Sequence, residues 1–387
     1  MANVLLLDAH TIQALPVMKA LKKSGHKVFI ECETKKSYGY YSRYSDVKFI
    51  KPLVDYNSNV YLQHIIKLVE KYDIDILLPL FDDSAQFASK YKEILKCILL
   101  LSVPTYDVFL KGYRKNNLMC FCKENGIPHP KTIELTIENI DYAAEYTGLP
   151  AIIKPDISFG ARGMMFVNNI KEIKILLKNI LRIYGTCTLQ EFIPPGGRQY
   201  MVHHFRTVAD EFLSSMVVEK IRYYPETGGS SCCNRTISYV EIETLTKKVL
   251  SKLNWEGIAH FDLIEDPRDN VIKIMEINPR LSGSIKSSFK AGVDYANIYV
   301  DYCLGNQIEN YNIKYNVYVR YLGLDILWFL KSVNRFNSNP SWFKFIGKDI
   351  CFQEGGLDDP FPFLFGTYSG IKKLFDFDFR KSKSGLR

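Results

Sequence analysis

The chain has 387 residues, 47% of them hydrophobic and 24% charged, so it is long enough for more than one packed core. No apolar run approaches the ~20 residues that span a bilayer, and the nine cysteines show no CxxC spacing, which predicts reduced thiols rather than a zinc or disulfide framework. The net charge of +8 is spread along the chain instead of forming a basic stripe, so we expect no nucleic-acid partner.

The start of the chain, MANVLLLDAH, has no basic leader before its first acidic residue, so we expect no signal peptide and a cytoplasmic protein. A local basic excess occurs in the tail, which is typical of a solvated end; its members are Arg380, Lys381, Lys383 and Arg387.

Short apolar strands and helical patterns alternate over the first 105 residues. Strands are predicted at 3–8, 27–31 and 74–80, with helical periodicity between them, which favours a parallel, doubly wound sheet. The loop after the first strand lacks GxGxxG, so dinucleotide binding is disfavoured. Asp82 and Asp83 follow the third strand, where ligands of open α/β sheets bind. They are candidates to hold an amine, or, equally, capping residues of a surface turn.

From residue 106 the pattern becomes α+β. Helices are expected at 114–124, 138–147, 171–183 and 242–253, two antiparallel strands over 199–219, a loop at 228–233, and a hairpin from AHFDLIE and VIKIMEINP. The stretch 306–387 is rich in Tyr, Trp and Phe and is predicted to be an appended piece packed on the rest.

Two segments are candidates for a nucleotide site. Lys154 ends an apolar strand and precedes a loop with Gly160 and Gly163, which suits phosphate oxygens, although a glycine-bearing hairpin turn remains the alternative. In QEFIPPGGRQY two prolines end an apolar strand. The segment can present backbone groups to the edge of an adenine ring; the alternative is an ordinary strand followed by a turn.

The hairpin carries the strongest chemical signal. Period-two alternation places Glu276 and Asn278 on one face, and hairpin pairing brings Asp262 beside them. Two carboxylates and an amide oxygen are hard ligands suited to Mg²⁺. Arg280, two residues further, can stabilise charge on a phosphoryl group or acyl phosphate. His203, His204 and His260 are predicted to be strand or core histidines.

Five motifs, taken in their order along the chain, resemble the ATP-grasp superfamily. They are RKNNLMCFCKENGIPHPKT, AIIKPDISFGARGM, LQEFIPPGGRQY, TGGSS and IMEINPRLSGS. The resemblance is to its branch that includes the carbamoyl-phosphate synthetase large chain and carboxylate–amine ligases. It covers residues 3 to about 305 and implies a Rossmann-like pre-ATP-grasp α/β domain (1–105) and an ATP-grasp N-terminal subdomain (106–188). A C-terminal subdomain with the metal hairpin (189–305) and an aromatic-rich extension (306–387) follow.

The resemblance also implies roles for single residues. Those assigned to ATP are Lys115, Lys154, Ser158, Phe159, Gly160, Gly163, Glu191, Phe192 and Ile193, with Gln199 where the family usually has a ribose-binding glutamate. Asp262, Glu276 and Asn278 would bind Mg²⁺ or Mn²⁺, and Arg280 would contact phosphate, with Lys220 and Arg222 as further phosphate contacts. The loop of Thr227, Gly228, Gly229 and Ser230 would approach the reacting carboxylate.

The implied reaction converts a carboxylate into an acyl phosphate, which an amine then attacks. Its expected partners are small-molecule carboxylate and amine substrates, with a homodimer left open. The pathway suggested by analogy is the synthesis of a surface polysaccharide or secondary metabolite. The alternatives are a carbamoyl-phosphate-synthetase-like or biotin-carboxylase-like subunit acting on bicarbonate, a kinase, and a non-catalytic ATP-binding module.

Overall fold

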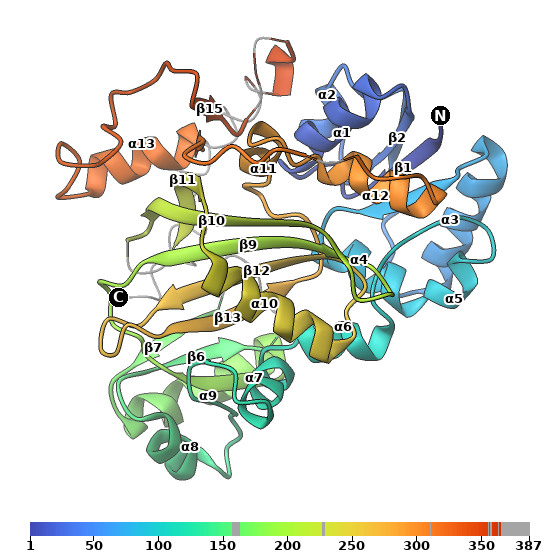
Figure 1. Cartoon of the computed structure of the whole chain (residues 1–387). Coiled ribbons are helices and arrows are strands. Elements are labelled where there is room, and N and C mark those ends of the chain that lie inside the picture. The colour runs from blue at the N-terminus through green and yellow to red at the C-terminus, as the bar shows by residue number, and fades with distance from the viewer. Residues whose placement is uncertain are drawn as a thin grey trace.

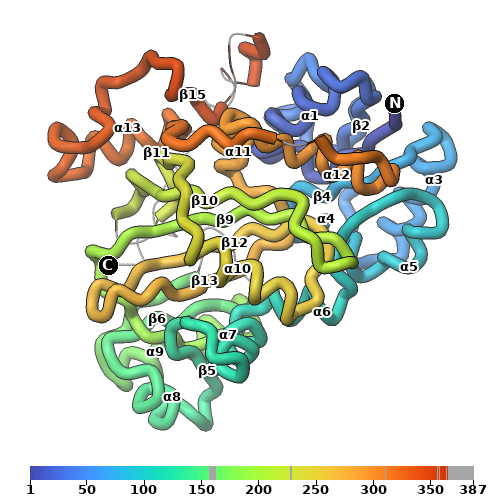
Figure 2. The backbone as a smooth tube through the Cα atoms, viewed as in Figure 1, coloured from blue at the N-terminus to red at the C-terminus, as the bar shows by residue number. Residues whose placement is uncertain are grey.

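The computed structural model describes residues 1–156, 163–226, 229–309, 311–354, 356, 358–362 and 364. Three sheets organise this part of the chain (Figure 1). Figure 2 shows the backbone passing from the N-terminal sheet to a small lobe and then into the large central sheet. Among the described residues no helix combines the length and apolar character needed to cross a bilayer.

The N-terminal sheet is parallel, in the order β3-β2-β1-β4. Val4 and Leu6 pack on the side of α1, whereas Leu5 and Leu7 pack on the side of α3. Because both faces are buried, its inner strands are continuous apolar runs, and the predicted parallel sheet is confirmed. Its elements are β1 (Asn3–Leu7), α1 (Ala14–Lys23), β2 (Lys27–Cys32), α2 (Tyr38–Tyr41), β3 (Val47–Ile50), α3 (Asn59–Tyr72), β4 (Ile76–Pro79), α4 (Asp82–Lys90) and α5 (Lys92–Leu95). Strand β3 was not predicted; it is a four-residue edge strand with alternating exposure.

Two helices lead into a small lobe, which holds a four-stranded sheet in the order β5-β8-β6-β7. One face of this sheet packs on α8 and α9 through aliphatic side chains such as Ile153, Ile173 and Leu189. The elements are α6 (Tyr106–Tyr113), α7 (Lys115–Glu124), β5 (Thr132–Glu134), α8 (Ile140–Thr147), β6 (Ala151–Pro155), β7 (Met165–Val167), α9 (Ile170–Tyr184) and β8 (Cys187–Glu191).

The large sheet has seven strands in the order β13-β12-β9-β10-β11-β14-β15. Residues such as Met201 and Val218 face α1 and α12, and Val202 and Val217 face α7 and α10, so the sheet is the centre of the molecule. The elements are β9 (Gln199–Arg206), β10 (Phe212–Tyr224), β11 (Ser230–Ile237), α10 (Val240–Leu253), β12 (Gly257–Glu265), β13 (Ile272–Asn278), α11 (Lys286–Lys290), α12 (Tyr295–Leu304), β14 (Tyr318–Arg320), α13 (Leu322–Lys331) and β15 (Ile350–Phe352).

Two expectations about this region are corrected. The segment GGSSCC was predicted to be a loop, but β11 begins at Ser230 and pairs with both β10 and β14. The C-terminal stretch is more than a packed appendage, because β14 and β15 extend the large sheet. The domain boundaries at 105, 188 and 305 stay predictions.

A buried ion network fastens the C-terminal strands to the sheet. The Asp325 carboxylate accepts from Arg222 Nε at 2.8 Å and Nη2 at 2.9 Å, and from Arg320 Nε at 2.6 Å. All three side chains are 0–1% exposed. A carboxylate shared by two guanidiniums in a dry interior is costly to remove, because both cations would stay buried without it.

We therefore predict that Asp325→Ala destabilises the protein by about 3–5 kcal/mol, which thermal and urea unfolding would measure. Asp349→Ala is the matched control, because it breaks a half-exposed ion pair with Lys344 and should cost less than about 1 kcal/mol. Equal shifts in the two unfolding midpoints would show that the buried network does not carry this stability.

Candidate functional site

The β12–β13 hairpin brings together the residues expected to bind a metal. Asp262 lies directly opposite Glu276, and the register shifts between Asp262 and Leu263. Asn278 Nδ2 lies 3.4 Å from Glu276 Oε1 and 3.5 Å from Asp262 Oδ2. The three side chains expected to bind a metal therefore converge at one end of the hairpin.

The chemistry of these three residues fits Mg²⁺. They offer two carboxylates and one amide oxygen, and Mg²⁺ takes few protein oxygens while keeping positions for water and phosphate. Within the described ranges no group of three or more His, Cys, Asp or Glu side chains is placed so that it could hold a metal ion, so this site rests on two carboxylates and one amide.

Lys220 extends the cluster from β10. Its Nζ donates to Asp262 Oδ1 at 2.7 Å, and the side chain is 12% exposed. Gln199 pairs with Lys220 across the β9–β10 ladder, so the predicted ribose residue lies on the same sheet face.

Lys154 projects from the end of β6 in the small lobe. Its buried Nζ donates to Gln190 Oε1, and Gln190 Nε2 donates to Thr132 Oγ1 at 2.9 Å. Burial lowers the pKa of Lys154 to about 8; Glu276 opposes this shift and Lys115 adds to it. These couplings place the two predicted phosphate lysines and the hairpin carboxylate in one electrostatic neighbourhood.

Lys115 is the first residue of α7, and its Nζ lies 3.4 Å from the Asp156 carbonyl oxygen. Asp156 Oδ1 accepts from the Asn116 backbone N–H at 3.0 Å, which ties the start of this helix to the strand end that carries Lys154. Ser158, Phe159 and Gly160 lie outside the described residues.

Gly163 follows that segment with φ +70°, and an added Cβ would lie 2.6 Å from the Tyr184 ring. A side chain is therefore excluded at Gly163 both by its backbone conformation and by the space around it.

The segment expected to hold adenine follows β8. Glu191 is buried and pairs with Lys273 at 2.8 Å and Arg268 at 3.4 Å, so its side chain is committed to the hairpin turn. The Phe192 ring meets Phe166 edge to face at 4.9 Å. Ile193 is also buried. The use of this segment for adenine stays a prediction.

Arg280 joins the hairpin to the N-terminal sheet. Its Nε donates to Asp82 Oδ1 at 2.9 Å, its guanidinium lies 5.4 Å from the Phe81 ring centroid, and its Nη2 lies 3.4 Å from Asn278 Oδ1. The carboxylate of Asp82, expected to hold an amine, is thereby occupied by Arg280. Asp83 is exposed, and the pKa of its carboxyl is raised by partial burial and by nearby Asp8 and Asp82.

The structure separates Arg222 from the other predicted phosphate contacts. Lys220 pairs with Asn234, whereas Arg222 pairs with Cys233, so an irregularity between them turns the two side chains to opposite faces of the sheet. The Arg222 guanidinium is taken up by Asp325 and the Pro340 carbonyl. This geometry argues against the phosphate contact expected for Arg222.

Thr227 and Gly228 lie outside the described residues. Gly229 packs against the backbone of Tyr224, where a Cβ would lie 2.0 Å from the carbonyl carbon, and Ser230 is exposed at the start of β11.

Two residues near the site were not predicted to take part. Gln190 binds Lys154, and its only signal was a polar residue in the predicted strand TLQEFIPP. His260 is a buried strand histidine, as predicted, and its Nε2 also lies 3.9 Å from Asp262 Oδ2 and its Nδ1 3.3 Å from Asn278 Nδ2. Burial, Arg280 and Lys220 lower the pKa of His260, so its imidazole is neutral at pH 7. His203, which stacks on His260, and His204 make hydrogen bonds to buried serine and threonine hydroxyls.

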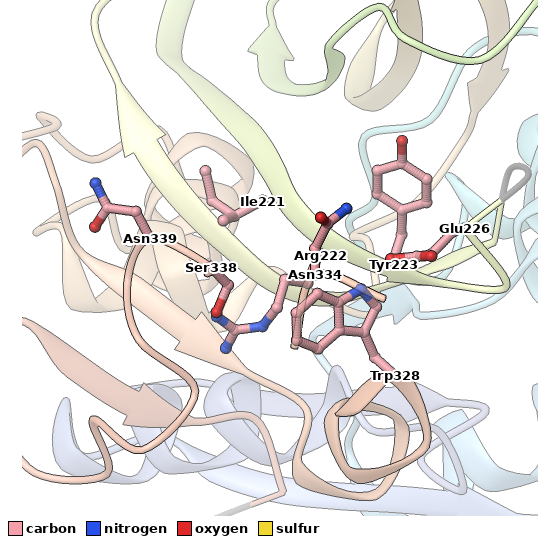
Figure 3. Close-up of a pocket in the computed structure, with 8 residues that line it drawn as sticks. All are labelled: Ile221, Arg222, Tyr223, Glu226, Trp328, Asn334, Ser338 and Asn339. Atoms are coloured by element: carbon pink, nitrogen blue, oxygen red, sulfur yellow. The ribbon is translucent and has the colours of Figure 1, made fainter. Parts of the chain in front are cut away.

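A separate cavity of about 370 Å³ lies between β10 and the C-terminal segment (Figure 3). Arg222 and Trp328 form part of its wall, with Glu226 and Asn334 nearby. Lys220 and the hairpin carboxylates do not line it, so it is distinct from the candidate site.

Comparisons with known proteins agree with this geometry. A family described as "ATP-grasp in the biosynthetic pathway with Ter operon" matches residues 233–323. A carbamoyl phosphate synthase large chain from Pseudothermotoga lettingae is 22% identical over 71% of this chain and 25% of its own length. The D-aspartate ligase of Enterococcus faecium is 23% identical over 62% of both chains. The chain thus spans less than two thirds of each of these relatives.

Among solved structures, the biotin carboxylase domain of Hydrogenobacter thermophilus 2-oxoglutarate carboxylase, a dimer with MgADP, ADP and bicarbonate, superposes with a TM-score of 0.67. It is 15% identical, and the match covers 82% of this chain and 73% of that one. The predicted mixed α/β fold is confirmed by this likeness. The family match over residues 233–323 and the two curated relatives thus make the chain similar to ATP-grasp proteins and to carbamoyl phosphate synthase and D-aspartate ligase chains.

Proposed function

We propose that the chain is an ATP-dependent ligase that activates a carboxylate as an acyl phosphate for attack by an amine, releasing ADP and phosphate. One observation carries the proposal: Asp262, Glu276 and Asn278 converge beside Lys154 from the small lobe and Arg280 from the junction with the N-terminal sheet. Oxygen donors for a metal and cations for phosphate thus meet at one place, as phosphoryl transfer requires.

Asp262, Glu276 and Asn278 would hold Mg²⁺, or Mn²⁺ with the same donors; when bound, the ion would neutralise charge on the phosphates. Lys115 and Lys154 would bind phosphate oxygens, and Arg280 would stabilise the charge on the group in transfer. Asp82 holds Arg280 in place through a charge-assisted hydrogen bond, so we assign it a positioning role.

The nucleotide would lie between the two lobes. Glu191, Phe192 and Ile193 would contact adenine, and Gln199 the ribose hydroxyls, because Gln199 shares a sheet face with Lys220. Ser158, Phe159, Gly160 and Gly163 would cover the phosphates. Closing that loop would keep water from the acyl phosphate.

The carboxylate and the amine would meet between Lys220, the 227–230 segment and the N-terminal sheet. Lys220 is the cation there for a carboxylate or phosphate oxygen, since Arg222 faces away. Thr227, Gly228, Gly229 and Ser230 would border the carboxylate. Asp83 is the acidic side chain we assign to the amine, because Asp82 is paired with Arg280.

The relatives support a ligase and leave its substrates open. The D-aspartate ligase is named for joining an amino acid, which favours a carboxylate–amine pair. The biotin carboxylase domain was solved with bicarbonate, which favours bicarbonate as the second candidate carboxylate. We also propose that the protein acts in the synthesis of a surface polysaccharide or secondary metabolite, that it is located in the cytoplasm, and that it forms a homodimer.

The first test is ADP release from Mg²⁺·ATP with a panel of carboxylates, bicarbonate, amino acids and ammonium. We expect release that requires one carboxylate together with one amine, and a loss of at least about a hundredfold in Glu276→Ala, because a hard metal ligand is removed. Glu241→Ala, an exposed carboxylate on α10, is the matched control and should keep wild-type turnover.

Stimulation by bicarbonate alone would favour the carboxylase-like alternative. If the protein binds ATP but no substrate pair stimulates turnover, the non-catalytic ATP-binding module is favoured. If Glu276→Ala turns over as fast as wild type, the assigned metal site is refuted.

A second prediction concerns pH. In the ATP-free protein the Lys154 pKa is lowered to about 8, and phosphate charge would raise it again, so ATP binding above pH 8 should take up a proton. Affinity should therefore fall as pH rises through 8, by up to about tenfold per unit. Titration calorimetry between pH 7 and 9.5 would measure this slope.

Lys154→Met should bind ATP more weakly and lose the pH dependence. If wild type and Lys154→Met share one slope, another group titrates and the assignment of Lys154 fails.

A further inference from the structure

The end of α13 and the segment that follows it expose five large apolar side chains. They lie at the outer edge of the molecule, on the side away from the N-terminal sheet (Figure 1). The exposed fractions are 62% for Leu330, 88% for Val333, 67% for Phe336, 59% for Phe343 and 92% for Ile346. We call these five side chains the 330–346 patch.

The aromatic members of the patch rest on better-covered rings. Phe336 and Phe343 lie 6.5 Å apart by ring centroids, and each is 5.6 Å from Phe329. Phe329 stacks on Trp342 at 4.2 Å, and the Trp342 indole N–H donates to the Asp325 carbonyl at 3.0 Å. The patch is thus anchored to the buried ion network at its base.

Charge near the patch is mostly positive; the acidic side chains that contact this segment include Asp349, which pairs with Lys344, and Glu226, which accepts from Ser332. Between residues 326 and 348 the sequence has four basic residues and no acidic one; the basic residues are Lys331, Arg335, Lys344 and Lys348. Lys344 is paired with Asp349 at 2.7 Å, and the Arg335 guanidinium lies 5.5 Å from the Phe336 ring centroid. Exposed phenyl and aliphatic groups interspersed with lysine and arginine are typical of peripheral membrane-binding surfaces.

We propose that the 330–346 patch docks the protein on the surface of an anionic phospholipid bilayer. The apolar side chains would enter the headgroup boundary, and Lys331, Arg335 and Lys348 would contact lipid phosphates, whereas Lys344 is paired with Asp349. The proposal is independent of the ligase assignment, because the patch shares no residue with the candidate site.

Two other occupants fit the charges less well. A second copy placed face to face would bring two sets of four cations together. The chain's own last residues, 365–387, contain six basic and two acidic side chains, so their net charge is positive, like that of the patch.

The test is co-sedimentation of the full chain with vesicles of phosphatidylglycerol and phosphatidylcholine, compared with phosphatidylcholine alone. We expect binding to the anionic vesicles only, weakened by salt. The double variant Phe336→Ser, Phe343→Ser should bind on the order of tenfold more weakly. The double variant Lys331→Gln, Lys348→Gln should bind the anionic vesicles about fivefold more weakly for each cation removed.

The matched control is Val208→Ser with Val240→Ser, two exposed valines that each lie within two residues of an acidic residue; this variant should bind as wild type does. Thermal unfolding checks that each variant folds. Equal binding to both vesicle types, or unchanged binding by the phenylalanine variant, overturns the proposal. So does a dimer in light scattering that this variant dissociates, because the patch would then join two copies.

Discussion

The pairing register of β12 with β13 is the constraint on which the candidate site depends. Side chains alternate between faces along a strand, so a slip by one residue would send Glu276 to the other face of the sheet. The register is fixed because Phe261 and Ile277 must enter the core shared with α10, and β9 pairs with β12 along its whole length. Core packing thus fixes the positions of the carboxylates, and no contact between the site residues themselves is needed to hold them there.

Charges at the site are balanced in pairs that link different parts of the fold. Arg280 and Asp82 are 198 residues apart in sequence, and their contact joins the hairpin to the N-terminal sheet. Lys154 is held by the neutral Gln190, and its lowered pKa reflects a cation buried without a full counter-charge. A site in which one cation is paired and another is left electrostatically unsatisfied is suited to attract an anion such as phosphate.

The sequence predicted features that depend on local pattern. Alternation and hairpin pairing foretold that Asp262, Glu276 and Asn278 would meet, and the apolar runs foretold the parallel sheet. It could not predict the irregularity beside Ile221, because nothing local distinguishes that residue from its neighbours. Nor could it foresee β11: its small polar start has poor strand propensity, and pairing with strands on both sides overrides that preference.

The irregularity beside Ile221 also explains how one strand serves two purposes. Before it, Lys220 faces the hairpin and Asp262; after it, Arg222 faces Asp325 and the C-terminal segment. Regular alternation would have placed both cations on the same face, leaving Asp325 with Arg320 alone and crowding the phosphate end with a further positive charge. The two register shifts on either side of Arg222 therefore separate the chemistry of the site from the ion network that anchors the C-terminal strands.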